Sequence, residues 1–272
     1  MPEPIPTAPP DHERHTLTGD IRFHKEFPSR FLKGAHDVVI YLPPGYDTER
    51  VRRYPVLYMH DGQNLFDAAT AFGHTEWGVD ETAQALILGG AIEPLIVVGI
   101  YNDGAYRIDE YTPTRDSARK AGGKANLYGR MLVEELKPFI DVTYRTLGDA
   151  ANTGLGGSSL GGLVSLYLGL KYSEIYGKLA VLSPSVWWDN RFIVRRVRAL
   201  HTKPPQRIWL STGTDEGPNV ARAARAARDA LIAKGWILDQ DLAYVEFPGA
   251  RHHESAWAAL VEPTLRFLFP AQ

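Results

Sequence analysis

Two short runs of uninterrupted apolar residues constrain the fold of this chain most. Residues 56–59 read VLYM and residues 95–100 read LIVVGI, and both runs are rich in β-branched or aromatic side chains. A strand with one face in water alternates polar and apolar residues, whereas continuous apolar runs are typical of strands buried on both faces. These runs therefore predict a mainly parallel sheet that is covered by helices on both sides.

Further strands and helices alternate along the chain. Strands are predicted at HDVVIYL, GKLAVLSPS, QRIWLSTGTDEG and LAYVEFPGA, which begin at residues 36, 177, 206 and 242. Apolar residues at helical spacing predict helices over 78–90, 126–144, 220–235 and 255–269, and a Gly-rich loop followed by an apolar helix over 152–172. Alternating strands and helices favour a doubly wound α/β fold, with a Pro-rich lead over 1–20 and a single domain over 21–272.

Composition excludes several classes of protein. The formal net charge is −2, from 30 basic and 32 acidic residues, which leaves no electrostatic footprint for nucleic acid or an anionic membrane. There is no cysteine, so a thiolate nucleophile and Cys-ligated metals are excluded. The N-terminus MPEPIPTAPPDHERH has no apolar signal-peptide core and no apolar run long enough for a transmembrane helix exists, so we expect a cytoplasmic protein with small-molecule partners.

The segment Gly157-Ser158-Ser159-Leu160-Gly161 is a G-x-S-x-G element that precedes the apolar helix. Glycines on both sides allow a tight turn that projects the serine hydroxyl at a helix N-terminus, where backbone N–H groups face developing negative charge. Ser159 is the predicted nucleophile, because a register centred on Ser158 would put Leu160 at the second glycine. The same segment fits neither the dinucleotide fingerprint nor a P-loop.

An activated serine needs a general base and an acid that orients it, in the chain order Ser, Asp or Glu, His. Asp215 follows a predicted strand and is the preferred acid, with Glu216 the nearest competitor and Asp189 a weaker one. His252 and His253 follow the last predicted strand, and one of them should be the base. The upstream histidines at positions 60 and 74 break this order, and the latter does not form an HExxH zinc motif.

Together these motifs resemble the esterase D-like ("putative esterase") branch of the α/β-hydrolases, which includes enterochelin-type, feruloyl and acetylxylan esterases and mycolyltransferases. The matching stretches are VVIYLPPGYD, YPVLYMHDGQNLFD, GGSSLGGLVSLYLGLKY, VLSPSVWWDN, STGTDEG and ARHHESAW, spread from Val38 to Trp257. The resemblance implies an α/β-hydrolase fold. It places the catalytic histidine at the head of H-x-E-x-x-W, which favours His252, and it places the acid at Asp215.

The resemblance also implies an oxyanion hole made by the backbone N–H groups of Gln63 and Leu160. The implied reaction is attack of Ser159 on an ester, release of the alcohol and hydrolysis of the acyl-enzyme by water, with no metal and no organic cofactor. An acyltransferase or a siderophore-lactone esterase with the same triad, and a non-catalytic binding protein with this fold, are the alternatives.

Trp187 and Trp188 follow a predicted strand directly and should emerge at the same end of the sheet as the triad. An indole face could cover the apolar part of a substrate, whereas two large aromatic residues could equally pack as core. Because adjacent residues usually point in different directions, we expect Trp187 to line the substrate site and Trp188 to anchor the loop.

Overall fold

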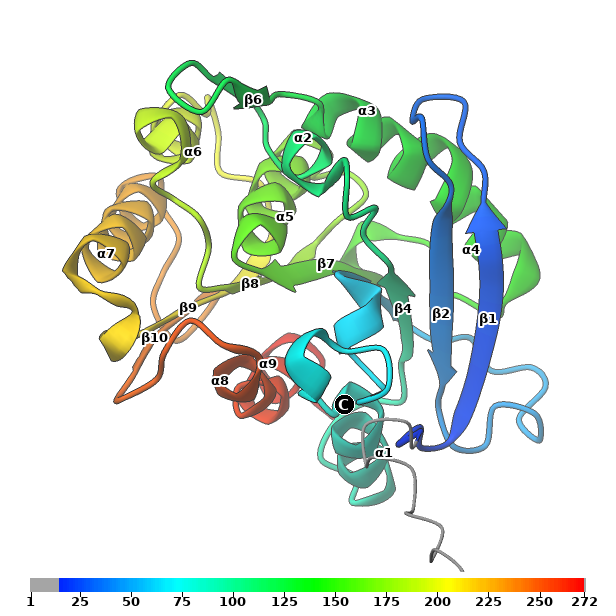
Figure 1. The fold of residues 1–272 in the computed structure, drawn as a ribbon. Helices are drawn as coiled ribbons and strands as arrows, with labels where there is room; N and C mark the ends of the chain where they lie inside the picture. Colours follow the sequence, from blue (N-terminus) through cyan, green and yellow to red (C-terminus); the bar gives the residue numbers. More distant parts are fainter. Residues whose placement is uncertain (1–14, 272) are drawn as a thin grey trace, which may run out of the picture.

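The computed structural model describes residues 15–271, and an eight-stranded sheet runs through this part of the chain (Figure 1). Its strand order is β1-β2-β4-β3-β7-β8-β9-β10. β1 and β2 are antiparallel to each other, β2 is antiparallel to β4, and every other neighbouring pair is parallel. The strands are β1 Asp20–Phe27, β2 His36–Leu42, β3 Val56–His60, β4 Ile96–Ile100, β7 Thr153–Ser158, β8 Lys178–Leu182, β9 Arg207–Gly213 and β10 Leu242–Phe247; β5 Arg115–Asp116 and β6 Ala121–Gly122 form a separate hairpin.

Both faces of the sheet are buried, as the uninterrupted apolar runs predicted. Successive side chains of a strand point to opposite faces, and β3 divides accordingly between two apolar cores. Val56 and Tyr58 belong to one core, and Leu57 and Met59 belong to the other. All five residues of β3 are buried.

Helices form a layer on each face of the sheet (Figure 1). α1 and α9 pack against each other on one face, with α8 beside them. The other face carries α3, α5, α6 and α7. The helices are α1 Val79–Leu88, α2 Arg107–Glu110, α3 Ala125–Arg130, α4 Lys137–Thr143, α5 Leu160–Lys171, α6 Trp188–Arg198, α7 Pro218–Ala233, α8 Glu254–Ala258 and α9 Val261–Leu268, with a π-helical turn Met131–Leu136 between α3 and α4.

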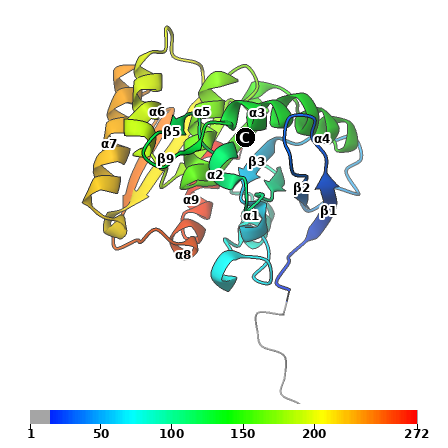
Figure 2. The same ribbon diagram turned by 45° about the horizontal axis from the view of Figure 1, so that its top comes forward.

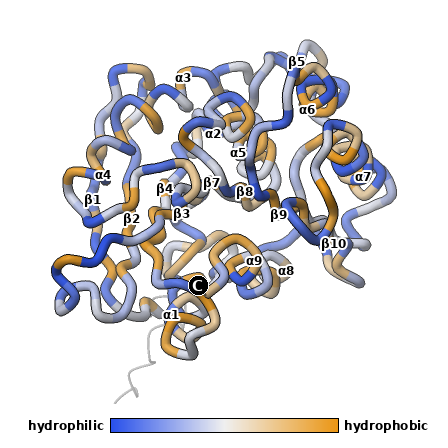
Figure 3. The backbone as a smooth tube through the Cα atoms, turned by 180° about the vertical axis from the view of Figure 1, so that it is seen from behind, coloured by the Kyte–Doolittle hydropathy of each residue, from blue (hydrophilic) through white to orange (hydrophobic). Residues whose placement is uncertain are grey.

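α1 and α7 each show hydrophobic and hydrophilic stretches, as expected for helices that press one face onto the sheet (Figure 3). None of the helices within residues 15–271 is long and apolar enough to cross a lipid bilayer. The predicted doubly wound, mainly parallel α/β architecture is confirmed. Of the predicted Pro-rich lead over 1–20, residues 1–14 lie outside the described residues.

Two local predictions were wrong, and two elements were not predicted. The Gly-rich segment before the apolar helix is not a loop but strand β7, because its glycines lie where neighbouring strands leave no room for a side chain: a Cβ on Gly156 would lie 2.7 Å from the Cβ of Ala180. The helix predicted over 255–269 is divided into α8 and α9. Edge strand β1 and helix α6 were not predicted at all, and β1 has only a partly buried, irregular pattern.

The carboxyl ends of the parallel strands all lie at the same edge of the sheet. The predicted site residues lie in the turns that follow these ends. β3 is followed there by the short 3₁₀ turn Gly62–Asn64, β7 by Ser159, and β9 by the 3₁₀ turn Thr214–Glu216. Figure 2 shows the same ribbon tilted, with α8 and the segment before α1 lying near each other on this side. Ligands of open α/β sheets bind outside the carboxyl ends of the strands, so this edge is the expected place for a site.

Candidate active site

Ser159 occupies a sharp turn between β7 and α5. Its φ of 57° and ψ of −120° are unfavourable for a residue with a side chain. Backbone hydrogen bonds fix this conformation: the Ser159 N–H donates to the Leu182 carbonyl at 3.0 Å, and the Ser159 carbonyl accepts from Ser185 at 2.9 Å and from Leu163 at 3.0 Å. The turn therefore holds the hydroxyl in one place at the N-terminus of α5.

The two glycines of the G-x-S-x-G element are required by close packing around this turn. A Cβ on Gly157 would lie 3.1 Å from both the Gly161 carbonyl carbon and the Cβ of His60. A Cβ on Gly161 would lie 3.3 Å from the Cβ of His60 and from Asp61 Oδ2. The glycines thus let β3, β7 and α5 approach closely enough to form the turn.

The structure brings His252, and not His253, to the serine. His252 Nε2 lies 2.9 Å from Ser159 Oγ. His253 is instead the N-cap residue of α8, and its Nδ1 accepts a hydrogen bond from the Ser255 N–H at 3.2 Å. The imidazole of His252 is also steadied by Trp257, whose ring meets it edge-on at a centroid distance of 5.0 Å.

The carboxylate that contacts His252 is Glu216, which corrects the prediction of Asp215. Glu216 Oε2 lies 2.6 Å from His252 Nδ1. Asp215 is exposed, and its carboxylate accepts only the Thr214 hydroxyl at 3.3 Å among the described residues. The other candidate, Asp189, lies in the first turn of α6 and does not contact His252.

The 3₁₀ turn after β9 explains why the two neighbouring acids differ. The Asp215 N–H donates to the Ala250 carbonyl at 3.0 Å, which fixes the turn and leaves the Asp215 side chain facing outward. The Glu216 side chain folds back over the end of β9, where its Oε1 accepts from the Gly213 N–H at 2.6 Å. The extra methylene of Glu216 then lets Oε2 reach the imidazole.

Ser183 is a site residue that sequence reasoning missed. Its hydroxyl donates to Glu216 Oε1 at 2.6 Å and accepts from the Trp257 Nε1–H at 3.0 Å. Burial alone would raise the pKa of Glu216, but the hydrogen bonds from His252, Ser183 and the Gly213 N–H together hold this pKa below its usual value. Glu216 is therefore kept as a carboxylate beside the imidazole.

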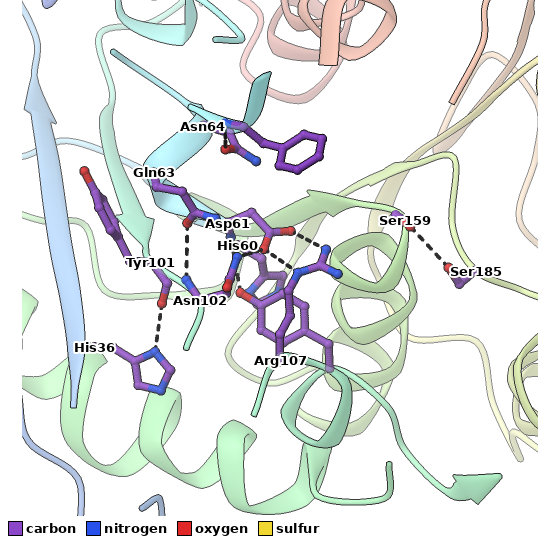
Figure 4. A network of polar contacts seen from close by, with 12 residues as sticks. His36, His60, Asp61, Gln63, Asn64, Tyr101, Asn102, Arg107, Ser159 and Ser185 are labelled. Carbon is purple, nitrogen blue, oxygen red and sulfur yellow. Dashed lines mark hydrogen bonds and ion pairs between the residues drawn. The ribbon is translucent and has the colours of Figure 1, made fainter. Parts of the chain in front are cut away.

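The turn that carries Gln63 lies beside Ser159 and is held by a buried ion pair. Asp61 has a left-handed φ of 58° and accepts two hydrogen bonds from Arg107, each 2.7 Å long, and one from the Asn102 amide, also 2.7 Å long (Figure 4). The backbone N–H of Asn102 donates to Gln63 Oε1 at 3.3 Å. Arg107 and Asn102 were not predicted, because they lie far from the motifs in sequence.

Gln63 and Leu160 are both positioned near the serine, as the oxyanion-hole prediction requires. Leu160 is the first residue of α5, so its N–H has no acceptor within the helix. Gln63 and Ser159 line the same cavity. The backbone N–H groups of these two residues are therefore candidates for binding a negatively charged oxygen at the N-terminus of α5.

A cavity of about 460 Å³ opens over Ser159 and His252. Polar groups of Gln63, Asn64, Asn102 and Arg107 form much of its lining. Its most exposed apolar side chain is that of Phe72, which is 72% exposed. The volume lies within the ordinary range of small-molecule sites, about 300–1,000 Å³.

Neither tryptophan predicted to bind substrate lines this cavity. Trp188 is buried and its Nε1–H donates to the Thr114 carbonyl at 2.9 Å, so it packs as the anchor of its loop. Trp187 is 38% exposed, and the guanidinium of Arg119 lies 4.6 Å from its ring centroid. The sequence did place both tryptophans directly after a strand. It did not predict the hairpin β5–β6, against which Trp188 packs.

A mainly parallel α/β sheet with a serine on a strained strand-to-helix turn, a histidine at hydrogen-bond distance and a carboxylate behind it defines an α/β-hydrolase. The family described as "Putative esterase" matches residues 29–268. The chain therefore belongs to this esterase family, which confirms the family resemblance of its motifs.

The chain is also similar to individual proteins and to solved structures. The chain is 26% identical to "Uncharacterized protein YbbA" of Bacillus subtilis over 88% of its length and 92% of the relative's. It is also 26% identical to an "Endo-1,4-beta-xylanase/feruloyl esterase" of Xylanibacter ruminicola, over 85% of this chain and 29% of that protein. The crystal structure of an IroE-like serine hydrolase from Shewanella oneidensis has the same fold, with a TM-score of 0.75 and 23% identity over 92% of this chain and 80% of that one.

Proposed function

We propose that this esterase is a serine carboxylic-ester hydrolase that works through an acyl-enzyme on Ser159. The observation that carries the proposal is the continuous line of contacts from Ser159 Oγ to His252 Nε2 at 2.9 Å and from His252 Nδ1 to Glu216 Oε2 at 2.6 Å. In this arrangement a histidine can accept a proton on one nitrogen while a carboxylate fixes its tautomer through the other.

The reaction then proceeds in two symmetrical halves. Ser159 Oγ attacks the ester carbonyl carbon while its proton moves to His252 Nε2, and the imidazolium returns that proton to the alcohol oxygen as the carbon–oxygen bond breaks. Water next attacks the acyl-enzyme, with His252 again accepting and returning the proton. Glu216 remains ionised throughout and stabilises the imidazolium.

The negative charge on the former carbonyl oxygen is stabilised by the N–H groups of Gln63 and Leu160. Each such donor typically lowers the barrier by about 3–4 kcal/mol, provided that it is already in place when the charge develops. The Asp61–Arg107 ion pair supports this requirement, because it fixes the turn that carries Gln63.

For substrates we propose small acyl, aromatic or carbohydrate esters. The cavity combines the amide groups of Gln63, Asn64 and Asn102 with the exposed ring of Phe72, a lining that suits a small acid or sugar with an apolar face better than a long aliphatic chain. The feruloyl esterase activity named for one relative points in the same direction.

A fluorophosphonate probe tests the nucleophile. We expect labelling of the wild-type protein on Ser159 alone, and Ser159→Ala should lose labelling and at least about 10⁴-fold in hydrolysis of p-nitrophenyl acetate while melting as the wild type does. Ser158→Ala is the matched control, because Ser158 is the buried neighbour at the end of β7, and this variant should keep both activities. Labelling that persists in Ser159→Ala would overturn the proposal.

A substrate panel tests the ester class. We expect short p-nitrophenyl esters, methyl ferulate and acetylated xylo-oligosaccharides to be turned over faster than p-nitrophenyl palmitate. An added alcohol separates a hydrolase from an acyltransferase, since a transferase converts the acyl group mainly to the new ester. Preference for the palmitate ester would contradict the proposed substrate class.

A further inference from the structure

Three carboxylates lie close together in the first turn of α1 and just before it. One side-chain oxygen each of Glu76, Asp80 and Glu81 lies within 4.8 Å of the others. Asp80 has no exposed surface, and the other two side chains are partly buried. Carboxylates in such a position need hydrogen bonds or a counter-charge.

Hydrogen bonds satisfy only half of these oxygens. The Thr16 hydroxyl donates to Glu76 Oε1 at 2.5 Å, the Thr18 N–H to Asp80 Oδ2 at 2.7 Å, and the Thr18 hydroxyl to Glu81 Oε1 at 3.1 Å. The second oxygen of each group is buried and has no hydrogen-bond partner among the described residues. These oxygens are Glu76 Oε2, Asp80 Oδ1 and Glu81 Oε2.

No cationic side chain compensates the cluster within residues 15–271. The charged groups that act on Glu76 are Glu81 and Asp67, both acidic, and Asp67 already contacts His15 at 2.6 Å. The cluster therefore has three unpartnered carboxylate oxygens, one of them on the fully buried Asp80, and no neighbouring positive charge among the described residues.

We propose that Glu76, Asp80 and Glu81 bind a calcium ion that does not take part in the ester chemistry. Donor sets made only of carboxylate oxygens suit hard cations. The ligand oxygens of the three residues lie within 4.8 Å of one another, which is close enough to share one ion. Ca²⁺ accepts several protein carboxylates in a flexible geometry, whereas Mg²⁺ demands a near-ideal octahedron and usually keeps several of its waters, so we assign the site to Ca²⁺.

The ion would join three parts of the chain. Through Thr16 and Thr18 the carboxylates hold the segment before β1, which passes close to α1 in Figures 1 and 2. Glu76 is followed by Trp77, whose N–H donates to the Asn64 carbonyl at 2.8 Å, and Asn64 lines the active-site cavity. The site would thus stabilise the wall of the cavity without contacting substrate.

Calcium titration of the full-length protein tests this site independently of the proposed catalysis. After removal of metal with EDTA, Ca²⁺ should bind with measurable heat in calorimetry and raise the melting temperature by about 5 °C at saturation, with Mg²⁺ giving less. Asp80→Asn and Glu81→Gln keep acceptor oxygens for Thr18 but lose charge, and both should lose the binding heat and the Ca²⁺-dependent shift.

Glu262→Gln is the matched control, because Glu262 is an exposed carboxylate on α9 paired with Arg266, and it should retain the full calcium response. The proposal is overturned if the EDTA-treated wild type shows neither binding heat nor a melting shift at millimolar Ca²⁺. A shift that is equally large in both cluster variants would also overturn it. If the cluster instead stores a proton, Asp80→Asn will stabilise the protein in EDTA and Ca²⁺ will have no effect.

Discussion

Glu216 keeps its charge in a nearly solvent-free position because donors surround its carboxylate. The Ser183 hydroxyl and the Gly213 N–H both donate to Oε1, while Oε2 faces His252. An amide at this position could present its NH₂ group to Nδ1 and so favour the imidazole tautomer that cannot accept a proton from the serine. The activity therefore depends both on the negative charge of Glu216 and on its accepting a hydrogen bond from His252 Nδ1.

Glu216→Gln should consequently lose about 10³–10⁴-fold in kcat with little change in KM, measured on a short p-nitrophenyl ester. Asp215→Asn is the matched control and should stay within about twofold of the wild type, because the Asp215 side chain faces outward. The opposite ranking of the two variants would restore Asp215 as the acid.

The choice between these adjacent acids marks the limit of sequence reasoning at the scale of residues. Ser159 could be predicted because only one register of its motif puts glycine on both sides. His252 was preferred to His253 only through the family pattern H-x-E-x-x-W, whose tryptophan packs against it in the structure. Both acids follow the same strand, and only the turn Thr214–Glu216 decides which one points at the histidine. Backbone dihedrals of a three-residue turn cannot be predicted from residue types alone.

At the scale of elements, the oxyanion turn depends on α2, which carries Arg107. The Asp61 backbone is held in its left-handed conformation by a bidentate ion pair to this arginine, and its N–H donates to the Tyr111 hydroxyl at 3.2 Å. Gly62 in the same turn lies against β4, where a Cβ would come within 2.5 Å of the Gly99 carbonyl carbon. The turn is therefore held by contacts to two elements that are distant in sequence, α2 and β4.

Arg107→Lys should lower kcat about tenfold and Arg107→Met about 100-fold, with a nearly constant KM. Lysine keeps the charge but cannot form two parallel hydrogen bonds to Asp61, so the Gln63 N–H is held less firmly where the oxyanion develops. Steady-state kinetics with a melting curve for each variant separates this effect from loss of fold.

Arg130→Lys provides the comparison, because Arg130 forms a similar ion pair with Glu134 on the exposed side of α3, and its kinetics should be unchanged. A rise in KM without a fall in kcat for the Arg107 variants would show that this side chain contacts substrate instead of supporting the turn.

The elements that could be predicted are those in which local pattern and tertiary burial agree. Strands β2, β3 and β4 each contain a continuous run of buried apolar residues, and most alanines of α7 are buried. β7 could not be predicted because glycine disfavours strands. Here glycine is required by close contacts with β3 and β8, since a Cβ on Gly154 would lie 2.9 Å from Leu57 Cδ1 and one on Gly156 would lie 2.7 Å from the Cβ of Ala180. The carboxylates of α1 were equally unremarkable in sequence, since acidic residues are common in the first turn of a helix.

At the scale of the whole molecule, an apolar core lies on each face of the sheet. A few titratable side chains are buried between the sheet and the helices. His60, the last residue of β3, has no exposed surface. Its Nδ1 lies 2.9 Å from the Tyr128 hydroxyl, and its ring stacks obliquely on Tyr111 and Tyr128. Burial, only partly opposed by Asp61, lowers the pKa of His60 to about 3.

Because His60 is buried in its neutral form, the stability of the protein should fall as the pH falls. The pKa of His60 is about 3 in the folded protein and 6.5 in the unfolded chain, so between these values the unfolded chain binds the extra proton. The stabilising contribution of neutral His60 is thus fully present above pH 6.5 and is lost as the pH falls from 6.5 toward 3. Each unit of that fall costs up to about 1.4 kcal/mol.

His60→Gln should therefore flatten the acid side of the stability profile. The variant will be less stable than the wild type at pH 7, because a well-packed ring is replaced, but between pH 7 and pH 5 it should lose about 2 kcal/mol less of its unfolding free energy. Urea unfolding at several pH values measures this difference directly. His201→Gln changes an exposed histidine and should retain the wild-type slope. Parallel pH profiles for His60→Gln and the wild type would mean that folding does not shift the pKa of His60, and that the acid sensitivity arises elsewhere.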